Sequence, residues 1–223
     1  SILAASDSFE ILVKGRSAQA SHPQDGVDAI VLAAQIVNAL QSIISRTIEP
    51  TDPALLTIGR IEGGTQSDLL ADRVRLTGIL RTLNDTTRRK IQRLMEAAVK
   101  GTTQAFGGDY SLAFKQSIPA VSNHPELYAS MLPVLNSVLA DRPLQRLAPQ
   151  MMADDFSFYG RKIPSLFFLL GVRNPRLSTA PLESPYFNPD ERSIAIGIKI
   201  ISQIILDCLE QQSRLADSSQ IVK

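Results

Sequence analysis

Residues 74–108 read VRLTGILRTLNDTTRRKIQRLMEAAVKGTTQAFGG and contain a complete transition from strand to helix. Apolar and polar side chains alternate through the first ten residues, which predicts a half-buried strand at 74–83. Asn84 or Asp85 is then placed to cap a helix whose apolar residues recur every three or four positions. The helix is predicted to run to Phe106, because two consecutive glycines follow it.

The same two patterns extend to both sides of this stretch. Alternation predicts three further strands, at residues 7–14, 55–61 and 110–114. An apolar face with helical spacing predicts a helix over residues 27–44, with Asp25 as its candidate N-cap. The resulting order is strand, helix, strand, strand, helix, strand, which is typical of the ferredoxin-like βαββαβ fold. We therefore expect residues 7–118 to form a ferredoxin-like domain.

The pattern changes after residue 118. Helices are predicted at residues 125–139, 154–160 and 190–209, together with one buried strand at 163–171. A lone buried strand cannot satisfy its own backbone N–H and C=O groups. We therefore expect residues 119–211 to be part of an α/β layer whose other strands lie upstream of Ser1.

The two ends of the chain carry their own expectations. Residues 212–223 are polar and are expected to fray. The chain begins with Ser1 rather than Met, so we expect it to be a processed, trimmed or partial chain.

Composition narrows the classes of function. The formal net charge is +1, and the most basic short run, residues 87–90, has the spacing of a solvated helix face. Neither a nucleic-acid partner nor a membrane span of about 20 apolar residues is predicted. Cys208 is the single cysteine, so no disulfide can form within one chain. That favours a reducing compartment, and we expect a cytoplasmic protein.

Several motifs, taken in order, resemble one family of enzymes. Residues 15–23 (GRSAQASHP) are similar to a Gly-Lys-Gly-Gly-His-Ala-Ala-x-Pro loop, and residues 182–185 (LESP) to a Leu-His-Ser-Pro loop. Residues 151–191 place an acidic pair before an aromatic run, an apolar segment and a Pro-rich loop. This order resembles the metal-dependent aminoacylase and amidohydrolase family, which includes hippurate hydrolases and auxin-conjugate hydrolases.

The resemblance implies a fold and a chemistry. It implies a ferredoxin-like lid that forms a homodimer, followed by the C-terminal part of an α/β metallopeptidase catalytic domain. In the complete family fold, two divalent metal ions such as zinc or manganese activate a water that cleaves the amide of an N-acyl amino acid. The family's N-terminal metal-binding half has no counterpart here. The resemblance thus implies that this chain alone binds no metal and is inactive.

The resemblance also assigns site residues. Gln19 and Asp68 stand where the family has the catalytic His and Asn of its lid, and Arg81 stands where a lid Arg binds the substrate carboxylate. Glu183 stands where the family has a metal-binding His. Asp154 is at a position close to the metal centre, although a carboxylate there also fits a simple helix cap.

These replacements change what the site can do. Gln19 can donate a hydrogen bond but cannot become cationic, and an ionised Asp68 has no donor for an oxyanion. Glu183 remains a possible zinc or manganese ligand. His22, three residues after Gln19, is an alternative source of an imidazole, whereas His124 fits an ordinary turn.

Three hypotheses remain open at this point. The first is a part of an N-acyl-amino-acid amidohydrolase. The second is a degenerate relative kept for dimerisation or ligand binding, with the helix that starts near Val27 and the strand at residues 55–61 forming a two-fold interface. The third is a stand-alone ferredoxin-like module that senses a small molecule.

Overall fold

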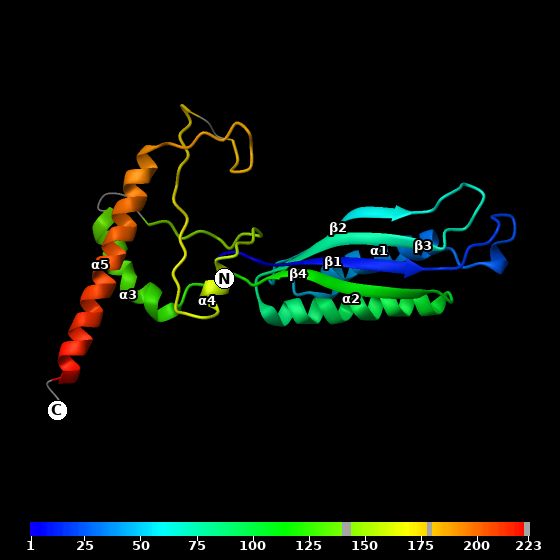
Figure 1. Ribbon diagram of the computed structural model, residues 1–223, viewed down its shortest axis with the longest axis horizontal. Coiled ribbons are helices and arrows are strands. Elements are labelled where there is room, and N and C mark those ends of the chain that lie inside the picture. The colour runs from blue at the N-terminus through cyan, green and yellow to red at the C-terminus, as the bar shows by residue number, and fades with distance from the viewer. Residues whose placement is uncertain (140–143, 178–179, 221–223) are drawn as a thin grey trace. The chain divides into compact units, whose positions relative to one another are not determined.

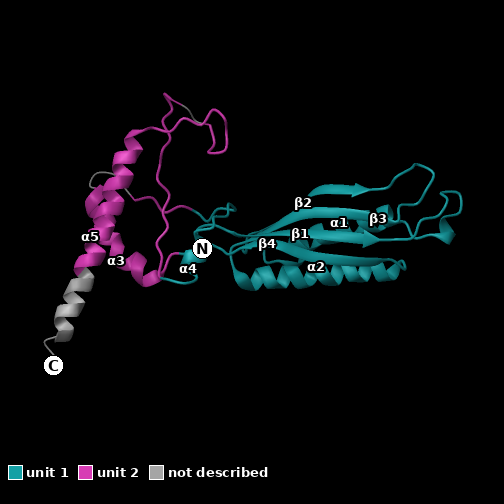
Figure 2. Cartoon of the chain, viewed as in Figure 1, with its two compact units in different colours: residues 1–122, 148–163 teal, residues 123–147, 164–223 magenta. Residues whose placement is uncertain are grey.

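A computed structural model describes residues 1–139, 144–177 and 180–220, with only the backbone of 211–220. The chain divides into two compact units (Figure 2). Unit 1 comprises Ser1–Ser122 and Ala148–Ile163, and unit 2 comprises Asn123–Leu147 and Pro164–Lys223. The predicted boundary between a lid and a catalytic portion at residue 118 stays a prediction.

Unit 1 is built on a four-stranded antiparallel sheet with the order β2-β3-β1-β4. Its strands are β1 (Ala5–Lys14), β2 (Ala54–Gly63), β3 (Arg73–Thr82) and β4 (Asp109–Ile118). The helices α1 (Ala29–Thr47) and α2 (Asp85–Ala105) follow β1 and β3. The predicted βαββαβ order is therefore confirmed.

Both helices lie on one face of this sheet (Figure 1). The core between them contains alternate residues of β1 and β3, such as Ile11 and Leu76, which are fully buried. α1 and α2 contribute apolar side chains with helical spacing, such as Ile36 and Ile91. The alternating apolar residues of the strands and the helically spaced apolar residues of α1 and α2 thus pack into a single core.

The helix caps were predicted correctly for α2 and wrongly for α1. The side chain of Asn84 accepts a hydrogen bond from the backbone N–H of Thr87 at 2.7 Å, as an N-cap does. α1 is capped by Asp28, whose Oδ1 accepts from the N–H of Ile30 at 2.8 Å. Asp25 belongs instead to the short 3-10 helix Pro23–Asp25, because Pro23 initiates a separate turn there.

Among the described helices, α1 alone has the length and mean hydropathy of a membrane span, by composition only. A third of its apolar window is buried in unit 1. The core helix of a globular domain can have the same length and hydropathy.

Unit 2 contains two long helices and an extended loop. α3 (Pro125–Leu139) has the predicted bounds, and it packs on α5 (Arg192–Gln220) through buried Met131, Leu135 and Ile200. α5 continues past the predicted end at residue 209 and extends to Gln220, whereas fraying of this polar end stays a prediction. Residues 221–223 lie outside the described residues.

The predicted buried strand at residues 163–171 is wrong. Residues 164–170 are extended without regular secondary structure, and Ile163 and Leu169 are exposed. The side chain of Asn123 takes the place of a neighbouring strand, because its amide donates to the carbonyl of Phe167 and accepts from the N–H of Phe167. A strand needs a regular ladder of backbone hydrogen bonds, and no strand is assigned to residues 163–171.

Candidate functional site

Two loops meet at the end of the unit 1 sheet that lies away from the N-terminus (Figure 1). The β1–α1 loop is closed at its base by an antiparallel bridge between Arg16 and Val27. A Cβ atom at Gly15 would lie 2.1 Å from the carbonyl oxygen of Val27, so only glycine allows this approach. We call this end of unit 1, with its two loops, the lid tip.

The lid tip brings together the first two predicted site residues. Gln19 forms an isolated bridge with Leu69, and the N–H of Ala20 donates to the carbonyl of Asp68 at 2.8 Å. Gln19 and Asp68 therefore come from adjacent backbone segments, and both are exposed. The pair presents an amide beside a carboxylate, so the amide is the only hydrogen-bond donor of the two side chains.

His22 belongs to the same loop. Its N–H donates to the carbonyl of Gln19 at 2.8 Å, and its Nδ1 lies 3.0 Å from the Oγ of Ser21. The imidazole is exposed and lies one turn from Gln19. Whether it replaces the family's lid His stays a prediction.

Arg81 is not at the lid tip. It is eight residues along β3 from Arg73, which corresponds to roughly 26 Å of strand. Its guanidinium donates to the backbone carbonyl of Met151. Within one chain, Arg81 and the Gln19–Asp68 pair therefore lie at opposite ends of the sheet and cannot contact one small substrate.

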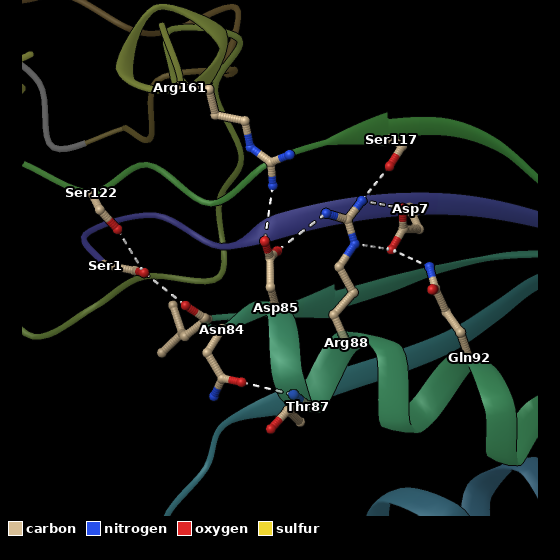
Figure 3. A network of polar contacts seen from close by, with 11 residues as sticks. Ser1, Asp7, Asn84, Asp85, Thr87, Arg88, Gln92, Ser117, Ser122 and Arg161 are labelled. Atoms are coloured by element: carbon tan, nitrogen blue, oxygen red, sulfur yellow. Dashed lines mark hydrogen bonds and ion pairs between the residues drawn. The ribbon is translucent and has the colours of Figure 1, made fainter. Parts of the chain in front are cut away.

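The base of unit 1, near Arg81, contains a buried ion pair that sequence reasoning missed (Figure 3). Arg88 of α2 donates to Asp7 of β1 through Nε at 2.7 Å and Nη2 at 2.5 Å. Arg88 also donates to Ser117, and Gln92 donates to Asp7 at 3.1 Å. The Asp7 carboxylate raises the pKa of Arg88 through these hydrogen bonds. Asp7 lies two residues before buried Phe9, so both side chains point to the same face of β1. A carboxylate at a buried position of a strand was the feature of the sequence that could have indicated this ion pair.

The same base holds the segment that includes Asp154. Arg161 pairs with Asp85 at the start of α2, at 3.0 Å. Asp154 Oδ1 accepts from the N–H of Phe156 at 2.8 Å, immediately before the short helix α4 (Ser157–Gly160). The helix is shorter than the predicted 154–160, and Asp154 makes the contact of a cap. Its proposed role beside a metal stays untested.

Glu183 lies in unit 2 on an exposed turn. The N–H of Ser184 donates to the carbonyl of Pro181 at 2.9 Å, and this turn presents Glu183 to solvent. No His, Cys, Asp or Glu side chains gather in threes across the described residues in a way that could hold a metal ion. Structural and catalytic zinc sites need three or four such ligands. The described residues therefore do not fit a two-metal centre.

Comparisons with known proteins agree on the type of domain. Residues 5–105 match the family model described as peptidase dimerisation domain. A probable hydrolase of Synechocystis sp. is 32% identical over 203 residues, which are 90% of this chain and 52% of that protein. An N-acetyldiaminopimelate deacetylase of Lactococcus lactis is 31% identical over 207 residues, 92% of this chain and 53% of the relative.

Solved structures extend the likeness to both units. A putative aminohydrolase from methicillin-resistant Staphylococcus aureus superposes with a TM-score of 0.87 at 28% identity, over 92% of this chain and 53% of the other. A dinuclear metal binding peptidase of the M20 family from Bacillus subtilis superposes with a TM-score of 0.75, over 94% of this chain and 51% of the other. At 22% identity the second comparison concerns the fold alone. The chain spans about half the length of the relatives it matches.

Proposed function

We propose that the chain belongs to the family of hydrolases that carry the M20 peptidase dimerisation domain, and that it is part of an amidohydrolase that cleaves N-acyl amino acids. In this proposal residues 7–118 are the dimerising lid, and residues 119–211 are the C-terminal portion of the catalytic domain. The likeness to hydrolases over about nine-tenths of this chain, but only half of each relative, carries the proposal. The metal-binding half is supplied by polypeptide outside these 223 residues.

The outer face of α5 supports an incomplete catalytic domain. Its apolar side chains recur along one face and are exposed: Ile194, Ile198, Ile201, Ile205 and Leu209. The opposite face of α5 packs on α3 through Ile200. A helix that is apolar on both faces is normally buried on both. A sheet layer over this stripe would bury it, as in the α/β architecture of helices packed on a sheet.

The chemistry of this chain's own residues would then be limited to binding and positioning. Arg81 offers a planar guanidinium that suits a carboxylate, once its contact with Met151 is exchanged for the substrate. Gln19, at the opposite end of the sheet, offers a neutral amide donor to a polarised carbonyl of a substrate held by a different copy of the chain. When bound in the completed domain, metal ions would supply the activated water.

The test compares the 223-residue chain with the same chain joined to its upstream coding sequence. Bound metal is measured by elemental analysis, and hydrolysis is measured with a panel of N-acetyl and N-benzoyl amino acids. We expect neither stoichiometric metal nor turnover from the chain alone, and both from the longer protein. Turnover by the 223-residue chain alone would contradict the proposal that the metal-binding half lies outside these residues.

Glu183 provides a sharper version of this test. We propose that Glu183 is a weak metal ligand in the completed domain. Glu183→His in the longer protein should raise zinc affinity about tenfold or more, because a neutral imidazole is a preferred zinc ligand. Glu191→His on an exposed residue nearby in sequence is the control. Equal zinc affinity in both variants would remove Glu183 from the metal site.

A second candidate function is a non-catalytic relative that binds a small molecule. It is favoured by the lid tip, where the exposed Asp68 carboxylate lies beside Gln19 and would repel a developing oxyanion. Stoichiometric metal in the longer protein without turnover of any N-acyl amino acid would favour this candidate. We propose a cytoplasmic location for either case, on the basis of the single cysteine.

A further inference from the structure

The base of unit 1 contains a cavity of about 350 Å³. This volume lies within the range of about 300–1,000 Å³ that is typical of small-molecule sites. The polar residues that line it come from segments that are far apart in the sequence: Ser1, Asn84, Asp85, Ser122, Ser157 and Arg161. All of these segments belong to unit 1. The proposed hydrolysis uses none of these residues.

Two charged side chains of opposite sign line this cavity (Figure 3). Arg161 Nη2 donates to Asp85 Oδ2 at 3.0 Å, and both side chains are about half exposed. This contact occupies one of the several N–H groups of the guanidinium, and a carboxylate accepts more than one hydrogen bond. Each partner of the ion pair therefore has hydrogen-bonding capacity left for a ligand.

Serine hydroxyls complete the polar lining of the cavity. Ser1 donates to the carbonyl of Leu83 at 2.7 Å, and its Oγ lies 2.9 Å from the Oγ of Ser122 (Figure 3). Ser157 is only 3% exposed, and its hydroxyl has no hydrogen-bond partner within the described residues. A buried hydroxyl without a partner has lost its water and gained nothing in return. Ser157 thus supplies a polar group that a bound ligand would satisfy.

The charges at the cavity favour a ligand that carries both signs. A simple anion would be attracted by Arg161 but repelled by Asp85, and a simple cation would meet the reverse. A zwitterion laid antiparallel to the ion pair places its carboxylate at Arg161 and its ammonium at Asp85. An α-amino acid carries these two groups on one carbon atom. Leu83 and Ala120 also line the cavity, which provides apolar contacts for a small apolar side chain.

We propose that the cavity at the base of unit 1 binds a free α-amino acid with a small apolar side chain. Arg161 and Ser157 bind its carboxylate, for which the planar guanidinium is suited, and Asp85 binds its ammonium group. The ligand would thereby join the segment at residues 157–161 to the start of α2. The inference goes beyond the proposed function and does not depend on it.

The test titrates the 223-residue chain with L-alanine by calorimetry. Three compounds of similar size serve as comparisons: propionate lacks the ammonium group, ethylamine lacks the carboxylate, and glycerol is a neutral polyol. We expect L-alanine to bind about tenfold or more tightly than each of them, because each lacks at least one charge-assisted contact. L-alanine should also shift the backbone amide signals of residues 84–85 and 157–161 in NMR spectra.

Variants locate the binding site. Arg161→Gln should weaken L-alanine binding about tenfold or more, because it removes the guanidinium. The matched control is Arg73→Gln, the same substitution at another exposed ion pair, in which Arg73 lies 3.0 Å from Asp72. Ser157→Ala should also weaken binding. It should leave the thermal stability of the ligand-free chain unchanged, because the hydroxyl has no partner to lose among the described residues.

Three outcomes would overturn the proposal. The first is L-alanine that binds no more tightly than propionate or ethylamine. The second is equal weakening of binding by Arg161→Gln and Arg73→Gln. The third is binding by the 223-residue chain that disappears when the chain is joined to its upstream coding sequence, which would show that upstream polypeptide occupies the cavity. None of these measurements follows hydrolysis, so each leaves the proposed function intact.

Discussion

Unit 1 and unit 2 bury their apolar residues to very different degrees. In unit 1 the sheet and two helices enclose a core whose central residues, such as Ile11, Leu76 and Ile91, are fully buried. In unit 2 the two helices bury a narrow seam around Met131, while the opposite face of α5 is exposed, with Ile205 at 53%. Both units contain amphipathic helices, so the difference lies in what covers them.

The difference separates helix formation from core formation. α1 and α2 pack on a sheet made by the same unit, whereas α5 has apolar residues on two faces and covers only one of them. Helices gain most of their stability from packing an apolar face. The exposed apolar face of α5 would therefore add stability to unit 2 if another element covered it. We therefore expect unit 1 to be stabilised by a core that it buries itself, and unit 2 to leave part of its apolar surface unburied.

The largest effect is expected from breaking the buried ion pair of unit 1. Asp7→Ala should lower the free energy of unfolding by about 3–5 kcal/mol, because it leaves the Arg88 guanidinium buried without its partner. Asp109→Ala is the matched control at the exposed pair with Lys14, and it should cost far less, because solvent screens an exposed pair. Chemical denaturation measures both, and equal losses would contradict the role given to burial.

The next effect compares one core residue from each unit. Leu76→Ala should cost about 2–5 kcal/mol, because the side chain is fully buried and leaves a cavity. Ile205→Ser should change the unfolding free energy by less than about 0.5 kcal/mol in the 223-residue chain. A loss from Ile205→Ser that matches the loss from Leu76→Ala would show that α5 is already covered and would remove the contrast between the units.

A smaller effect tests the position of the α1 cap. Asp28→Ala should cost about 0.5–2 kcal/mol, because Asp28 accepts from the first N–H groups of α1. Asp25→Ala removes the carboxylate at the position first predicted to be the cap and should have no measurable effect. Thermal melts of the two variants distinguish them, and the opposite order would restore Asp25 as the cap.

The smallest effect concerns pH and the start of α5. Hydrogen bonds from Arg192 and from Asn174 lower the pKa of Asp190. A lowered folded pKa means that this contribution to stability is present above the unfolded value of about 4 and is lost as pH falls below it. The protection factors of the amides at residues 190–194, which correct for the slower intrinsic exchange in acid, should therefore fall on acidification in the unchanged chain. Asp190→Asn should exchange quickly at neutral pH already.

Much of unit 1 was predictable from local patterns, because each of its strands and helices shows its period in sequence. The alternation through Phe9, Ile11 and Val13 identified β1, and Asn84 marked the start of α2. The cap of α1 was not predictable in the same way, because Asp25 and Asp28 are equivalent by residue type. Only the turn that Pro23 starts separates them.

Unit 2 exposes the limit of pattern reasoning. Residues 163–171 have the composition of a buried strand, but strand formation depends on a neighbour that a local pattern cannot supply. The candidate site shows a similar limit. Resemblance pointed to Gln19, Asp68 and Arg81 together, and the structure places only the first two at one end of the sheet. Position along a strand, rather than residue identity, separates them.

The amide of Asn123 holds both backbone groups of Phe167, at 2.9 Å from its carbonyl oxygen and 2.6 Å from its nitrogen. One side chain thereby restrains both backbone hydrogen-bonding groups of Phe167. Fixing one backbone conformation costs about 1–2 kcal/mol of conformational entropy per residue, and the two hydrogen bonds offset part of that cost at Phe167. Order in this irregular segment therefore comes from a side chain rather than from a strand ladder.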